Sequence, residues 1–124
     1  MSEAPVRLGL PRSRRIKQGR DFQRTKTQGK RLVSGCLIAN WAVLPAGAES
    51  RLGVITGRKL GKAVVRTRAR RLLREAYRLN QLQLTQPIDL VLVARHSIVG
   101  KAYKEVESDL MSALRRGKLI KGTE

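Results

Sequence analysis

The chain has 124 residues, of which 27 are Lys or Arg and nine are Asp or Glu, giving a formal net charge of +18. This length fits one domain, and a hydrophobic content of 41% is enough for a core, so a disordered basic tail is excluded. The longest apolar stretch is far shorter than the roughly 20 residues that cross a bilayer. Because such a charge repels itself in a compact fold, it indicates a polyanionic partner and disfavours a free-standing metabolic enzyme.

The N-terminal segment is basic and lacks apolar periodicity. We therefore expect an extended arm over residues 1–17, a single folded domain over 18–117 and a short tail over 118–124. Within the domain, a short helix is predicted over residues 20–27, with Gly29 just past its end. Cys36 is the only cysteine, which excludes an internal disulfide and predicts a small buried apolar side chain.

Two strand regions follow this helix. Residues 30–44 have strand character, in two pieces bent around Gly35, and residues 45–50 form a turn. Residues 51–56 are then predicted as the second strand of a hairpin, with Leu52 and Val54 on one face.

The second half of the chain alternates between helix and strand periods. After a basic loop at 57–63, helical periodicity holds from residue 64 or 65 to about residue 80. The apolar run at 88–94, interrupted only by Asp89, predicts a central strand covered on both faces. A last helix carries apolar residues from Tyr103 to Leu114 and ends at Gly117. This order predicts a mixed α/β sandwich with helices over a small sheet.

The helix over 64–80 divides into an apolar side and a cationic side. Its apolar side is formed by Val65, Ala69, Leu72, Leu73 and Ala76, and its cationic side by Arg70, Arg71, Arg74 and Arg78, with Arg66 and Arg68 on the flanks. Four arginines repeat at i,i+4 with only Glu75 to neutralise them, which costs stability in the free protein. A bound polyanion explains this pattern better than a solvated face, and arginine suits phosphate.

The remaining candidate residues give no autonomous active site. Loop 57–63 is one residue short of a phosphate-binding P-loop and has Ala63 where a hydroxyl would hold magnesium. His96 is the only histidine and is expected in an exposed loop. Phe22 and Trp41 are the candidates for stacking on bases, although packing is favoured for Trp41 and is as good an interpretation of Phe22. Tyr77 and Tyr103 are interpreted as packing residues.

The segment from residue 59 to residue 78, KLGKAVVRTRARRLLREAYR, resembles the protein subunit of bacterial ribonuclease P. That family carries the pattern K-x-G-x-A-V-x-R-N-R-x-K/R-R-x-x-R-E, and the resemblance extends over about residues 8–116. It implies an α+β fold in the order α-β-β-β-α-β-α, similar to domain 2 of ribosomal protein S5. The small, mostly antiparallel sheet would have a left-handed βαβ crossover, whereas such crossovers are usually right-handed.

The resemblance also implies a function. The domain would be a cytoplasmic RNA-binding subunit, monomeric apart from its RNA and without a membrane role. It would assist the catalytic RNA of ribonuclease P in removing the 5′ leader of precursor tRNA, leaving 5′-phosphomonoester ends. Catalysis would belong to the RNA, which would bind most of the Mg²⁺, and no protein metal site is assigned. The alternatives are a small basic ribosomal or other structural RNA-binding protein, and a stand-alone nuclease.

Two sets of site residues follow from the resemblance and the basic loop. The contacts to the catalytic RNA would be Arg58, Lys59, Lys62, Arg66, Arg68, Arg70, Arg71 and Arg74. The groove for the leader would involve Arg20, Phe22, Lys26, Leu37 and Trp41. The chain departs from the family at Thr67, which replaces an asparagine, and at Lys26, where many members have an aromatic residue. Asn40 or Trp41 falls near a strand position that is often Tyr or Phe.

Overall fold

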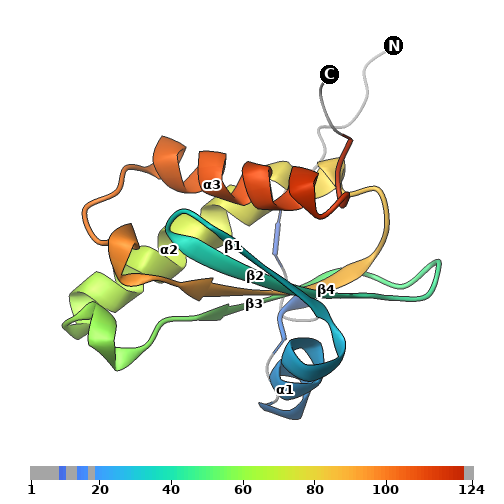
Figure 1. Ribbon diagram of the computed structural model, residues 1–124, viewed down its shortest axis with the longest axis horizontal. Helices are drawn as coiled ribbons and strands as arrows, with labels where there is room; N and C mark the ends of the chain where they lie inside the picture. The colour runs from blue at the N-terminus through green and yellow to red at the C-terminus, as the bar shows by residue number, and fades with distance from the viewer. Residues whose placement is uncertain (1–8, 11–13, 17–18, 122–124) are drawn as a thin grey trace.

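The computed structural model describes residues 9–10, 14–16 and 19–121 (Figure 1). The helices are α1 (Gly19–Gln28), α2 (Ala63–Asn80) and α3 (Tyr103–Arg116). The strands are β1 (Lys30–Ser34), β2 (Leu37–Val43), β3 (Arg51–Ile55) and β4 (Ile88–Ala94). Short 3-10 helices lie at η2 (Arg58–Leu60), η3 (Gln81–Gln83) and η4 (His96–Ile98). The predicted order of helices and strands is confirmed.

The four strands form one mixed sheet in the order β1-β2-β4-β3. β1 pairs with β2 and β2 with β4 in antiparallel orientation, whereas β3 and β4 are parallel. The sheet is therefore mostly antiparallel, as expected, and α2 forms the crossover between the parallel strands. The left-handed sense of this crossover stays a prediction of the resemblance.

The predicted hairpin between residues 30–44 and 51–56 is wrong. β4 lies between β2 and β3, so that Leu90 pairs with Trp41 on one side and with Leu52 on the other. The physical reason is the apolar content of β4, whose first five residues are all buried. A strand that is apolar on both faces is best placed inside the sheet, and there it separates the two strands expected to pair.

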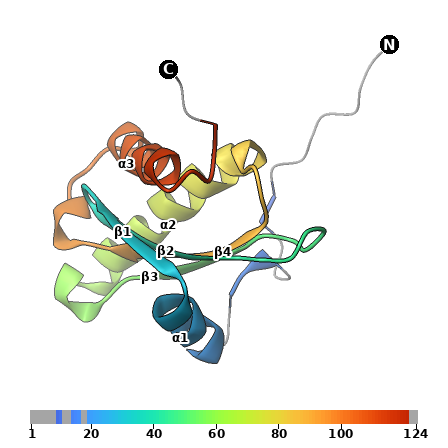
Figure 2. The ribbon, with the colours of Figure 1, turned by 45° about the vertical axis from the view of Figure 1, so that its right-hand side comes forward.

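The helices cover the two faces of the sheet unequally. α2 and α3 lie together on one face and α1 lies on the other (Figures 1 and 2). The main core fills the space between the sheet and the helix pair, and its largest fully buried side chains include Leu37, Leu73, Leu90, Leu92 and Leu110. Within the described part of the chain, no helix is both long and apolar enough to cross a bilayer.

Buried residues are also found outside the expected domain boundaries at residues 18 and 117. Ile16 is buried and its N–H donates to the Leu52 carbonyl at 2.9 Å, which attaches the end of the arm to β3. Leu119 and Ile120 are also buried. Between β1 and β2 the backbone turns at Gly35 with φ +53°, a conformation that favours glycine, which confirms the predicted bend. Cys36, beside this turn, is fully buried as predicted.

Candidate nucleic-acid interface

Helix α2 presents its apolar side to the core and its cationic side outward. Ala69, Leu73, Ala76 and Tyr77 are buried, which confirms the predicted packing side and the packing role of Tyr77. Val65 and Leu72 are half-buried at its margins. We call the five outward guanidinium groups at Arg66, Arg68, Arg70, Arg71 and Arg74 the arginine surface.

The arginine surface spans both margins of the helix. Arg66 and Arg70 are half-buried, while Arg68, Arg71 and Arg74 are exposed. On one margin, Arg70 donates to the Thr56 hydroxyl at 2.7 Å and contacts the Thr67 hydroxyl at 3.4 Å. On the other margin, Arg68 donates to the Lys101 carbonyl at 2.8 Å. Thr67, which replaces the family asparagine, therefore helps to hold Arg70 at the end of β3.

Like charges crowd this surface. Glu75, the only carboxylate on the helix, pairs with Arg78 at 2.7 Å, and this hydrogen bond lowers the pKa of the glutamate. Partial burial, and then the positive charges of Arg15 and Arg70, lower the pKa of the Arg74 guanidinium. Among the described residues, Arg71 and Arg74 have no ion-pair partner, and the enclosed Nε atom of Arg66 has no hydrogen-bond partner. Within the described chain the surface thus lacks carboxylate counter-charge, and the acceptors that it has serve only Arg68 and Arg70.

The basic loop continues this surface at the start of α2. Arg58 and Lys59 lie in η2, and Lys62 immediately precedes α2, all with exposed side chains. Arg58 and Lys59 line a hollow at the strand ends, together with Ile55, Val93 and His96. His96 is exposed after β4, as predicted. The loop thereby connects the arginine surface to the open end of the sheet.

The sheet face that carries α1 has an uncovered apolar strip. Val33, Ile38, Val93 and Ile55 are register partners across β1, β2, β4 and β3, and all four are at least partly exposed. Because register partners project from the same face, they form one row, which we call the apolar row. The row runs from Val33, 40% exposed, to the hollow beside η2.

Leu37 and Trp41 do not belong to this face, and their predicted place in the leader groove is corrected. Both are buried in the core on the side of α2 and α3. Trp41 packs beside Gly117, where a Cβ would lie 2.9 Å from the indole ring. Side chains alternate along a strand, so Ile38, Asn40 and Ala42 are the β2 residues that project from the α1 face. The preference for packing at Trp41 is confirmed.

Phe22 lies half-buried at the edge of the same face. It lines a hollow with Ile16 and Gly53, and Arg15 and Arg74 reach this hollow from the arm and from α2. A Cβ on Gly53 would lie 2.5 Å from the Phe22 ring, so only glycine admits the ring at this depth. The structure therefore joins the two predicted sites around edge strand β3. Gly53 was missed, although a glycine inside a strand signals a close approach.

The other two predicted groove residues lie on α1. Arg20 is exposed on its first turn. Lys26 is a helical residue whose side chain lies outside the described part of the structure. The buried Thr25 lies between them in the sequence.

An ion pair under α1 was also missed by the sequence analysis. The buried Asp89 accepts two hydrogen bonds from Arg51, at 2.9 and 2.7 Å, and Arg24 of α1 lies 4.0 Å from it. Burying a carboxylate without such partners would cost several kcal/mol. The single polar residue in the apolar run at 88–94 was its only signal. The Arg51–Asp89 pair joins β3 to β4, and Arg24 extends the contact to α1. These contacts help to position Phe22, which lies on α1.

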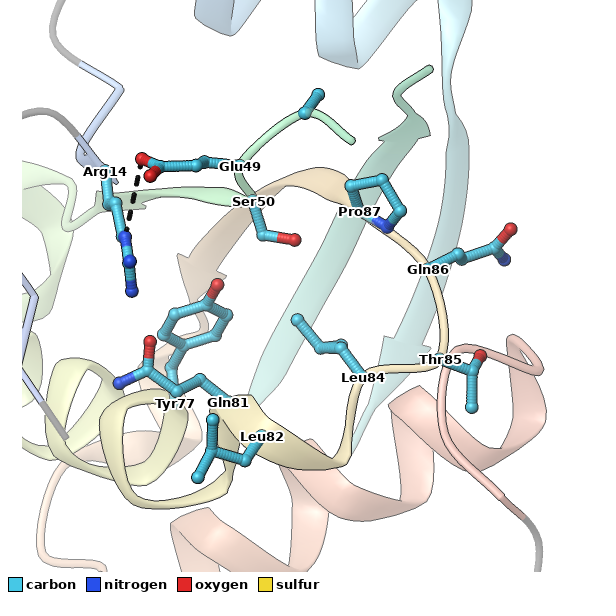
Figure 3. A pocket seen from close by; sticks show the side chains of 11 residues that line it. Arg14, Glu49, Ser50, Tyr77, Gln81, Leu82, Leu84, Thr85, Gln86 and Pro87 are labelled. Carbon is cyan, nitrogen blue, oxygen red and sulfur yellow. Dashed lines mark ion pairs between the residues drawn. The ribbon is translucent and has the colours of Figure 1, made fainter. Parts of the chain in front are cut away.

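A separate hollow lies at the other end of the sheet (Figure 3). Figure 3 shows the Tyr77 hydroxyl directed into it, near Ser50, and Arg14 paired with Glu49 at 3.5 Å. Burial raises the pKa of Tyr77 to about 12. Ser50 accepts the Ile88 N–H at 2.9 Å, and none of the predicted site residues lines this hollow. Within the described residues, no three His, Cys, Asp or Glu side chains gather as metal ligands.

A cationic helix face beside an open apolar sheet face defines a small α+β nucleic-acid-binding protein. A family model described as Ribonuclease P matches residues 10–118. The ribonuclease P protein component of Alkaliphilus oremlandii (strain OhILAs) is 36% identical over 107 residues, covering 86% of this chain and 92% of that protein. That of Clostridium novyi (strain NT) is 33% identical over 111 residues, covering 89% and 98%.

Solved structures agree with these matches. The ribonuclease P protein of Thermotoga maritima superposes with a TM-score of 0.73 at 28% identity, covering 87% of this chain and 98% of that one. The Staphylococcus aureus protein gives a TM-score of 0.79 at 24% identity, over 87% and 98% of the two chains, which shows the shared fold. The chain belongs to the ribonuclease P protein family, and it is an RNA-binding subunit of that ribonuclease holoenzyme.

Proposed function

We propose that the arginine surface and the basic loop bind the catalytic RNA, while the apolar row and Phe22 hold the single-stranded 5′ leader of precursor tRNA. The observation that carries this proposal is the like-charged surface of α2, on which Arg71 and Arg74 lack ion-pair partners within the described chain. Phosphate oxygens would supply both the missing counter-charge and the missing acceptors. The proposal places the protein in the cytoplasm as a monomer bound to its RNA.

The sheet face supports the proposed position of the leader. A strand of RNA lying along the apolar row would reach the cations of η2 at the β3 end of the row, where Phe22 packs against the neighbouring Gly53. Unpaired bases can stack on aromatic or apolar side chains, while their phosphates remain available to Arg and Lys. Mg²⁺ remains assigned to the RNA partner, whose phosphate oxygens are suitable ligands for a hard cation.

Reconstitution tests the assignment of roles. Precursor tRNA cleavage at low Mg²⁺ would be measured with the catalytic RNA alone, the protein alone and both together. We expect cleavage only with both, because the protein supplies binding and charge neutralisation but no catalytic group. Cleavage by protein alone would indicate a stand-alone nuclease. An RNA whose activity does not respond to the protein would favour another structural RNA-binding role.

A pair of valine variants tests the leader site. Val33 and Val43 are both exposed strand residues, at 40% and 57%, but Val33 belongs to the apolar row and Val43 projects from the opposite face. Val33→Asp should weaken binding of substrate with a leader by about tenfold, through lost contact and phosphate repulsion, and should spare leaderless tRNA. Val43→Asp should leave both affinities unchanged. Equal effects of the two variants would contradict the proposed leader position.

A further inference from the structure

A third hollow lies on the outer side of α2, away from the sheet. Its apolar floor is formed by Leu10 of the arm, Leu72 of α2 and Tyr103 at the start of α3. All three are half-buried and pack against the core on their inner sides. The arm is held here because Arg15 donates to the Leu10 carbonyl at 3.0 Å and Gln81 to the Gly9 carbonyl at 2.9 Å. We call this site the outer hollow.

The Tyr103 ring is fixed in orientation. Its hydroxyl donates to Glu107 Oε2 at 2.9 Å, and the same oxygen accepts from the Asn80 amide at 2.9 Å. Asn80 is in turn anchored to the Ala76 carbonyl at 2.8 Å. A ring held at its hydroxyl end loses little conformational freedom when a planar group stacks on it, which favours binding.

Guanidinium groups surround this floor. Arg68, Arg71 and Arg74 line the outer hollow, and the hydrogen bond from Arg68 to the Lys101 carbonyl fixes one of them. Glu75, the carboxylate at this rim, is already paired with Arg78. The rim is therefore cationic, and guanidinium groups bind phosphate through paired hydrogen bonds. A ligand that matches both the apolar floor and the cationic rim has a flat apolar portion and a phosphate.

We propose that the outer hollow takes one unpaired nucleotide of the catalytic RNA, with its base on Leu72 and Tyr103 and its phosphate between Arg68 and Arg71. The inference rests on the proposed function, because α2 must first lie on that RNA. A paired base could not reach the floor, since it stays stacked inside its helix, whereas an unpaired base can turn outward. Tyr103, interpreted from sequence as a packing residue, thereby acquires a binding role on its outer side.

Titration of the unmodified full-length protein tests the pocket directly. Adenosine 5′-monophosphate and inorganic phosphate would be added separately while the Leu72 methyl and Tyr103 ring signals are followed by NMR. We expect the nucleotide to shift both signals through the ring currents of the stacked base, and inorganic phosphate to leave them in place. Absent shifts, equal shifts with phosphate, or the same shifts with a short acidic peptide would overturn the proposal.

Variants in the reconstituted complex separate this inference from the proposed function. Tyr103→Leu should weaken binding to the catalytic RNA by about tenfold, the scale of one lost base stack, without changing the salt dependence. Tyr103→Phe keeps the ring but loses the hydrogen bond to Glu107, so it should bind more tightly than Tyr103→Leu and no more tightly than the parent. If the parent protein binds the RNA and Tyr103→Leu binds equally well, the pocket is not used. A parent that does not bind the RNA would instead overturn the proposed function. Should Tyr103→Leu fail to fold, the nucleotide titration decides.

Discussion

Asp89 illustrates how one buried residue can position a binding site that it does not itself form. The Asp89 side chain is 2% exposed. Its carboxylate pairs with Arg51 of β3 and lies 4.0 Å from Arg24 of α1. Phe22, on the same helix, reaches the sheet only because Gly53 has no side chain. The position of the aromatic ring therefore depends both on the ion pair beneath α1 and on the missing Cβ of Gly53.

Removing the Asp89 charge should destabilise the protein. Asp89→Asn removes the buried carboxylate charge that pairs with Arg51, and we expect the free energy of unfolding to fall by about 3 kcal/mol in urea titrations. The matched control is Glu49→Gln, which breaks the exposed pair with Arg14 and should cost less than about 1 kcal/mol. Similar losses in the two variants would refute the positioning role of Asp89.

Cys36 provides a pH-dependent contribution of known sign. Burial, and then the Asp109 carboxylate, raise the pKa of its thiol from 9.0 to about 12. The folded protein thus holds this proton more tightly than the unfolded chain, so the stabilisation is complete below pH 9 and is lost as the pH rises toward 12.

The corresponding measurement compares wild type with Cys36→Ala. Between pH 9 and pH 10, the free energy of unfolding of the wild type should fall by about 1 kcal/mol more than that of the variant. Because the two proteins share every other titrating group, the difference isolates the thiol. Parallel pH profiles would show that the folded protein does not favour the protonated thiol.

At the scale of the element, α2 was the most predictable part of the molecule. Its apolar side, its cationic side and its end near Asn80 all followed from a period of 3.6 residues. The positions of the strands were also predictable from the sequence, and the range 88–94 was predicted without error. The pairing of the strands was not predictable in this way, because it depends on the packing of the whole sheet and not on the local sequence pattern.

The errors at the leader site have a similar origin. β2 carries apolar residues at both strand parities, so alternation alone could not tell whether Leu37 and Trp41 or Ile38 would face α1. The arm residues near Phe22 lacked a periodic pattern altogether. Only the packed sheet, with two helices on one face and one on the other, assigns these side chains to a face.

The arginine surface should contribute to binding rather than to stability. Arg74→Gln removes a charge that is crowded by Arg15 and Arg70, so the thermal midpoint should stay unchanged or rise slightly. Affinity for the catalytic RNA should fall, and its salt dependence should lose about one unit of slope. Arg115→Gln, on the last turn of α3, is the control and should bind within about twofold of the parent. A stability loss at Arg74 without an affinity loss would contradict this division.

For the whole molecule, part of the positive charge behind the net +18 lies along a continuous path. The basic loop, the arginine surface and the Phe22 hollow adjoin one another around edge strand β3 and its connection to α2. The apolar side chains form one core, while the outward cations are suited to bind a partner of opposite charge. The protein therefore has the architecture of one component of an assembly.

The central claim is that phosphates of the catalytic RNA neutralise this cationic path. The most direct measurement is the dissociation constant for that RNA between about 50 and 200 mM monovalent salt. Because at least five guanidinium groups are assigned to phosphates, we expect a log–log slope of about −4 or steeper. A slope shallower than about −1 would contradict the account.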